Sequence, residues 1–278
     1  MKRFLWILLG LSMSVVQALP LQLQSQQLID EHLPGAHVGF EVRDAETGKV
    51  LLARQAFDHF TPASSLKLMT AAAAVRGLSE NFKFKTTIWS RQHALHHQAI
   101  KGDIWWEFSG DPTFSHKQLI SMVKALRKRS VKVIRGDVVV DGSHFKGRHY
   151  PFGWAEDSLP WGYSAPVTAE MVDHNAIYLA LQAGDRLGDP VSIKPDNQVP
   201  FPVKIDADVH TVTEGEADSH CNLWVHSDWD NSMHFRGCWP VSPKHKRLHV
   251  AVLHPQLWVR KMIEKAFADQ GIVIKGKV

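Results

Sequence analysis

Cysteine is scarce in this 278-residue sequence, which contains only Cys221 and Cys238. Long apolar runs are also scarce: beyond the first eighteen residues, no segment reaches the ~20 apolar residues that a membrane-spanning helix needs. There is no lipidation motif, internal repeat or low-complexity tract. The net charge is only +4, which gives no case for a nucleic-acid partner. We therefore expect a globular protein with no stable membrane anchor and no nucleic acid bound to it.

The first eighteen residues have the pattern of a secretory signal peptide. Lys2 and Arg3 form a positive start, and they are followed by the apolar run FLWILLGLSMSVV. The next residues, VQA, place small side chains before a cleavage site after Ala18. We expect residues 1–18 to be removed on export and the mature protein to lie in a bacterial periplasm.

An oxidising compartment favours a disulfide between the two cysteines, and two buried thiols are the alternative. Such a crosslink contributes about 3 kcal/mol in the chain-entropy model. Because His220, His226 and His234 lie in the same segment, a zinc site is a further alternative. The spacings fit no common zinc-finger pattern, so we expect the disulfide and neither metal nor cofactor.

The hydrophobic periodicity divides the chain at about Phe82. Before it, the sequence predicts a short helix, a hairpin over residues 37–54 and a second helix. After it, two amphipathic helices are predicted, KQLISMVKALRKR and PQLWVRKMIEKAFADQ. Short strands are predicted at FKFKTTIWS, DIWWEF, VIRGDVVVDG, NAIYLALQA, LHVAVLH and IVIKGKV, and loops or an inserted module at AGDRLGDPVSIKPDNQVPFP.

The stretch TPASSLKLMTAAAAV places Ser64 three residues before Lys67, where the second helix is expected to begin. Positions three apart share one face of a helix, so the lysine amine can reach the serine hydroxyl and take its proton. The helix N-terminus also directs backbone N–H groups toward developing negative charge. The alternative interpretation of this Ser-x-x-Lys pattern is purely structural: a serine that caps the helix, followed by a lysine in its first turn. The alanine-rich run that follows predicts a buried helix.

The blocks around this motif resemble those of the class C low-molecular-mass penicillin-binding proteins, which are D-alanyl-D-alanine carboxypeptidases and endopeptidases of the cell wall. The matching blocks are PASSLKLMTAAAA, FKFKTTI, GDIWWEFSGDPTF, IRGDVVVDGSHF, YSAPVTAEMVDHNAIYL and HFRGCWP. The resemblance implies an α/β (α+β) fold, in which a partial serine transpeptidase/β-lactamase-like domain carries inserted, mainly β modules. It implies a first lobe at residues 19–81, inserted domains at 82–250 and a return toward the first domain at 251–278.

The same resemblance implies roles for individual residues. Ser64 becomes the nucleophile that attacks a peptidoglycan stem peptide, Lys67 its base, and the backbone N–H of Ser64 an oxyanion donor. β-Lactams are expected to acylate the same serine. Asp157 is expected to contact a cationic group of the stem peptide.

Two further motifs of the family, Ser-x-Asn and Lys-Thr-Gly, are missing. Ser79-Glu80-Asn81 matches the first as text but lies in an expected turn, and no Lys-Thr-Gly occurs. We expect a chain that ends before both motifs, whether from a truncated gene, a split gene or a shortened record. The hairpin and the helix after Ser64 should then lack packing partners, and these residues alone should have little activity. The alternative is a non-catalytic periplasmic protein that binds the cell wall.

Four tryptophans leave two interpretations open. Trp105, Trp106, Trp154 and Trp161 could form a glycan-stacking surface, or they could pack in the core and at interfaces. The sequence favours packing.

Overall fold

A computed structural model describes residues 20–196, 203–219 and 221–278. The chain divides into two compact units at Phe82: unit 1 ends there, and unit 2 covers residues 83–278. The predicted signal peptide, residues 1–18, and His220 lie outside the described residues. In the described part of the chain, no helix combines the length and the apolar character needed to cross a bilayer.

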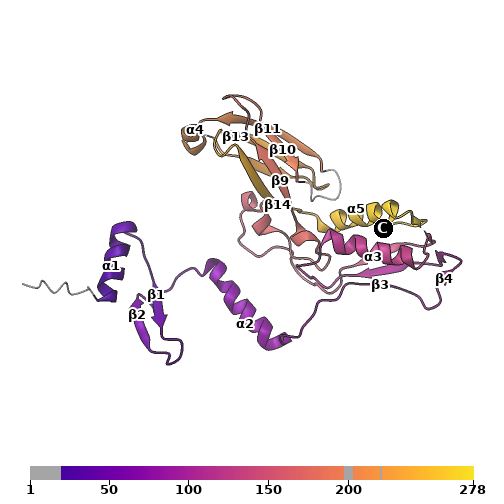
Figure 1. The fold of residues 1–278 in the computed structure, drawn as a ribbon, viewed down its shortest axis with the longest axis horizontal. Helices are drawn as coiled ribbons and strands as arrows, with labels where there is room; N and C mark the ends of the chain where they lie inside the picture. Colours follow the sequence, from indigo (N-terminus) through magenta and orange to yellow (C-terminus); the bar gives the residue numbers. More distant parts are fainter. Residues whose placement is uncertain (1–19, 197–202, 220) are drawn as a thin grey trace, which may run out of the picture. The chain divides into compact units, whose positions relative to one another are not determined.

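The described part of unit 1, residues 20–82, forms two α-helices, a short 3-10 helix and one hairpin, which can be followed in Figure 1. Its elements are α1 (Leu21–His32), β1 (Phe40–Arg43), β2 (Val50–Arg54), the 3-10 helix η1 (Ala63–Ser65) and α2 (Leu66–Leu78). The hairpin was predicted and is confirmed. Its turn is closed by Asp44, which accepts hydrogen bonds from the backbone N–H of Thr47 at 2.7 Å and from its hydroxyl at 2.6 Å. These bonds lower the pKa of Asp44.

The helix α2 is exposed along its whole length, which contradicts the prediction of a buried helix. None of its residues is buried, and Leu68 and Met69 are 74% and 69% exposed. None of the other described residues of unit 1 is buried either. The alanine-rich composition gave the helix correctly, but burial needs a packing partner, and no described part of unit 1 covers this surface. The expectation that the apolar faces of α2 lack partners agrees with this.

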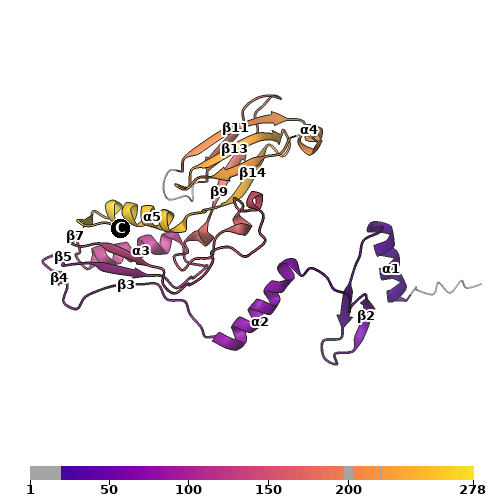
Figure 2. The same ribbon diagram turned by 180° about the vertical axis from the view of Figure 1, so that it is seen from behind.

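In one half of unit 2, two helices pack against two sheets. The sheets have strand orders β3-β6-β8 (Thr87–Ser90, Ile104–Glu107, Val138–Asp141) and β15-β7-β5-β4 (Val273–Ile274, Val133–Ile134, Ala99–Ile100, Leu95–His96). Helices α3 (His116–Lys128) and α5 (Pro255–Asp269) contact each other and lie side by side in Figures 1 and 2. β6 runs parallel to β8, and α3 lies in the long connection that a parallel pair requires.

Both helices follow from local sequence signals. A capping box starts α3, because the side chain of Ser115 accepts from the backbone of Gln118 while the Gln118 side chain accepts from the backbone of Ser115. Pro255 starts α5 at a position where no backbone N–H is needed. Apolar residues on one face of α5 enter the core, among them Trp258, Ile263 and Phe267.

The other half of unit 2 contains two three-stranded sheets and the short helix α4 (Glu214–Ser219). One sheet has the order β10-β9-β14 (Ser192–Pro195, Ala176–Gln182, His245–Ala251), and the other β11-β13-β12 (Ile205–Val212, Met233–Pro240, Trp224–Ser227). β9 alternates between buried and exposed residues, as its sequence predicts. The segment predicted as loops or an inserted module contains the strand β10, so the loop interpretation is wrong at that point. The mixed α/β class predicted from the sequence is confirmed.

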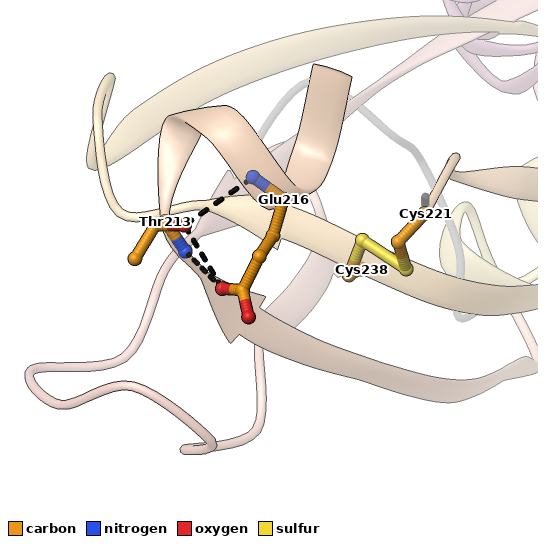
Figure 3. The surroundings of a disulfide bond; sticks show 4 residues. All are labelled: Thr213, Glu216, Cys221 and Cys238. Carbon is orange, nitrogen blue, oxygen red and sulfur yellow. Dashed lines mark hydrogen bonds between the residues drawn. A yellow bond between two sulfur atoms is a disulfide. The ribbon is translucent and has the colours of Figure 1, made fainter. Parts of the chain in front are cut away.

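The predicted disulfide between Cys221 and Cys238 is present, with Cα atoms 5.7 Å apart. It ties the segment after α4 (Glu214–Ser219) to β13 (Figure 3). In the same view, Thr213 and Glu216 form reciprocal hydrogen bonds at the start of α4. Because both sulfurs are bonded to each other, neither cysteine can supply the thiolate that the zinc alternative required.

Candidate active site

Ser64 lies in the 3-10 turn η1, and Lys67 is the second residue of α2. The residue before the serine, Ala63, has a φ of 42°, which is a left-handed conformation rare for a residue with a side chain. Pro62 lies before this turn, and the backbone N–H of Leu66 bonds back to the carbonyls of Ala63 and Ser64. Strained backbone of this kind is concentrated at functional positions in proteins.

The hydroxyl of Ser64 does not make a local hydrogen bond of the kind that the hydroxyl of Ser65 makes. Ser65 donates its hydroxyl proton to the carbonyl of Pro62. In this described segment no hydrogen bond joins Ser64 to Lys67, and both residues are exposed. The three-residue spacing therefore places the two groups in one turn, but their direct contact stays a prediction.

The start of α2, directly after Ser64, is the positive end of the helix dipole. Its N-cap, Ser65, makes no side-chain capping bond, and its first turn contains no acidic residue. The N–H groups of Ser65 and Leu66 bond to carbonyls of the preceding turn, but the aligned peptide dipoles at this end of the helix still attract negative charge. This arrangement suits the oxyanion that forms during acyl transfer.

Other residues singled out from the sequence lie elsewhere. Asp157 belongs to unit 2, where it is exposed in a short 3-10 helix (Glu156–Ser158), and its role toward a substrate stays a prediction. Ser79 ends α2 with a φ of 69°, in the turn that the sequence predicted. Trp106 is fully buried, so packing explains it, whereas Trp154 is 42% exposed.

Sequence reasoning missed one cluster of polar side chains in unit 2. His116, Asp173, His174 and His249 line a common cavity. They come from three separate stretches of structure, namely the start of α3, a tight turn before β9, and β14. No spacing along the chain pointed to this cluster.

Comparison with known proteins identifies the class of this chain. Residues 22–278 match the model of the D-Ala-D-Ala carboxypeptidase 3 (S13) family. The match covers most of the sequence, so the chain belongs to this family. The resemblance found in the sequence blocks is thereby confirmed.

Two curated relatives have similar sequences. One is the D-alanyl-D-alanine carboxypeptidase DacB of Haemophilus influenzae, 28% identical over 251 residues that make up 90% of this chain and 52% of that protein. The other is a D-alanyl-D-alanine carboxypeptidase of Actinomadura sp., 27% identical over 259 residues, 90% of this chain and 47% of that protein. The chain spans about half the length of these relatives.

Solved structures agree with the sequence comparison. The crystal structure of penicillin binding protein 4 from Haemophilus influenzae matches with a TM-score of 0.78 and 27% identity, over 91% of this chain and 55% of that one. A second crystal structure of the same protein, in complex with a β-lactam, matches with a TM-score of 0.70 and 26% identity, over 91% and 53%.

Proposed function

We propose that this chain carries the nucleophile of a serine-type D-Ala-D-Ala carboxypeptidase/endopeptidase that acts on peptidoglycan stem peptides and is acylated by β-lactams. The observation that carries the proposal is the position of Ser64 directly before α2, whose start has no side-chain cap and no acidic residue, in a chain that belongs to the S13 family. The names of the relatives and the β-lactam complex of penicillin binding protein 4 support it.

In the proposed reaction, the Oγ of Ser64 attacks the carbonyl carbon of the penultimate D-alanine. The neutral amine of Lys67 takes the hydroxyl proton. When the tetrahedral intermediate collapses, the C–N bond to the terminal D-alanine breaks, and the leaving amine receives the proton that Lys67 took from Ser64. Water then hydrolyses the acyl ester on Ser64. The backbone N–H of Ser64 is the proposed donor to the oxyanion in both steps.

Exposure argues for a slow reaction in this chain by itself. A lysine acts as a base when its surroundings hold it neutral, and burial is the usual means. No described residue of unit 1 is buried, so residues 20–82 do not enclose the amine of Lys67. We therefore propose that acylation at Ser64 is slow unless a packing partner from outside unit 1 covers α2.

We also propose the domain organisation and the location. Residues 19–81 are the first lobe of the catalytic domain, and residues 82–250 are inserted modules. Residues 251–278 lead back toward the catalytic domain, although α5 itself packs on α3. Cleavage after Ala18 and a periplasmic location accord with a substrate in the cell wall. A contact between Asp157 and a cationic group of the stem peptide is part of the same proposal.

The test is labelling with a fluorescent penicillin, followed by mapping of the labelled peptide. We expect slow labelling of the 278-residue protein that disappears in Ser64→Ala. The matched control is Ser65→Ala, which removes the neighbouring hydroxyl and should retain the label. Label that survives Ser64→Ala would overturn the assignment.

Two other outcomes of the labelling experiment test the slow rate of acylation and the non-catalytic alternative. Rapid, stoichiometric labelling at Ser64 would support the nucleophile and contradict the slow rate expected from the exposure of α2. Complete absence of labelling, with intact binding to peptidoglycan, would favour the alternative of a non-catalytic protein that binds the cell wall.

A further inference from the structure

A cavity of about 280 Å³ in unit 2 lies where α3 begins and where β9 and β14 run past it. It is lined by the imidazoles of His116, His174 and His249 and by the carboxylate of Asp173. Phe114 and Ile177 give it an apolar side. Cavities that join an apolar wall to a few convergent polar groups are the usual form of small-molecule sites.

The turn that delivers two of these side chains has an unusual backbone. Asp173, His174 and Asn175 have φ values of 50°, 60° and 52°, although none of them is glycine. The completely buried side chain of Asn175 holds the turn by donating to the carbonyl of Pro166 at 3.0 Å and to the hydroxyl of Thr168 at 3.1 Å. Three consecutive residues in a disfavoured conformation require such support, and they are typical of functional positions.

The carboxylate of Asp173, which lines the cavity, already interacts with His116. Asp173 contacts the Nδ1 of His116 at 2.7 Å and accepts from the backbone N–H of His116 at 3.2 Å. It is the one acidic residue among the described residues that line the cavity. The cavity therefore presents no free negative charge to a ligand.

The other two imidazoles are without hydrogen-bond or ion-pair partners among the residues that the structure describes. Elsewhere in the chain, by contrast, His37, His144 and His234 each contact a carboxylate within 3.1 Å. Burial lowers the pKa of His249, and the positive charges of His174 and Arg247 lower it further. A ligand that accepts hydrogen bonds from both imidazole rings would offset the electrostatic repulsion between His174 and His249.

We propose that this cavity binds a small carboxylate attached to an apolar body, with His174 and His249 donating N–H hydrogen bonds to the carboxylate and Phe114 and Ile177 contacting the body. A ligand the size of an acylated amino acid suits the volume. The inference concerns unit 2 and does not depend on the chemistry at Ser64.

The experiment measures binding of N-acetylalanine to the whole 278-residue protein. Titration is followed by calorimetry and by the imidazole NMR signals. In the wild-type protein, the signals of His174 and His249 should shift while the signal of His245, at the far end of β14, stays in place. N-acetylalaninamide, which lacks the charge, and inorganic phosphate, which lacks the apolar body, should each bind at least about tenfold more weakly.

Variants identify the groups responsible. His174→Asn removes the imidazole with a residue that tolerates the left-handed backbone, and His249→Phe keeps a ring against Tyr178, which lies 4.5 Å away. Each should weaken N-acetylalanine binding about tenfold or more, while the matched control His245→Gln binds as the wild type. Thermal melts establish that each variant is folded.

Several results would overturn the inference. They are the absence of binding at millimolar ligand, equal affinity for the carboxylate and its amide, equal affinity for phosphate, or NMR shifts that miss both His174 and His249. Wild-type affinity in folded His174→Asn and His249→Phe would do so as well. Failure of penicillin labelling at Ser64 would leave these measurements unaffected, so the two proposals fail separately.

Discussion

Trp105 and Trp106 are consecutive residues of β6, and their rings lie on opposite faces of one sheet. Trp106 is completely buried, with its ring centroid 5.9 Å from that of Phe108 and 6.3 Å from that of Phe267. Trp105 stacks on Trp89 of β3 at 4.5 Å, and Trp89 is 45% exposed. Alternation along a strand produces this division, because successive side chains point to opposite faces.

The division predicts very different costs for two neighbouring truncations. Trp106→Ala should lower the free energy of unfolding of unit 2 by about 3–5 kcal/mol, because it leaves a large cavity in the core. Trp105→Ala is the matched control, and it should cost about 1 kcal/mol from the lost stacking on Trp89. Urea denaturation followed by circular dichroism measures both. Similar costs for the two variants would contradict the burial seen for Trp106.

Replacement of Lys67 tests the proposed role of its amine as the base in acylation. If that role is correct, Lys67→Ala should slow penicillin labelling at Ser64 by about 10²–10⁴-fold, because the proton of the attacking hydroxyl loses its acceptor. Arg76→Ala removes a positive charge from the last turn of the same helix and should leave the labelling rate unchanged. Extended incubation with fluorescent penicillin gives the rates. An unchanged rate in Lys67→Ala would mean that another group takes the proton.

Reduction of the disulfide should destabilise unit 2 by about 3 kcal/mol, since the crosslink closes a loop with a sequence separation of 17. The expected result is a lower thermal midpoint in the presence of dithiothreitol. The control is the double variant Cys221→Ala/Cys238→Ala, whose midpoint should not respond to the reductant. A wild-type midpoint that also ignores complete reduction would show that the crosslink adds no stability.

His234 should make the stability of unit 2 depend on pH. Its ring nitrogens lie 2.8 Å from a carboxylate oxygen of Asp228 and 3.1 Å from one of Asp206, and these hydrogen bonds raise its pKa. A histidine whose pKa is raised by folding stabilises the protein below its unfolded pKa of ~6.5, and this contribution is lost as pH rises through the folded value.

The measurement is the difference in unfolding free energy between wild type and His234→Gln at two pH values. Taking the difference removes the contributions of His249 and His254, whose lowered pKa values act in the opposite direction. We expect a larger difference near pH 5.5 than near pH 8.5. A difference that is the same at both pH values would contradict the role of the two carboxylates.

The sequence by itself determined the elements and the family of this chain. Apolar spacing of three and four residues predicted α3 and α5, and alternation predicted β9 and β14, because each repeat follows from local backbone geometry. With only two cysteines, one disulfide was possible, and it is present. The sequence blocks around the Ser64 motif indicated the protein family, and the match of residues 22–278 to the family model confirmed it.

The tertiary structure alone decided which apolar surfaces are buried and which distant residues meet. Composition predicted a buried α2, but burial depends on what packs against a helix, and in the described unit 1 nothing does. His116 and Asp173 are 57 residues apart in sequence and 2.7 Å apart in space, because the turn before β9 returns to the start of α3. Local periodicity contains no information about such contacts, which arise only when separate elements pack into one core.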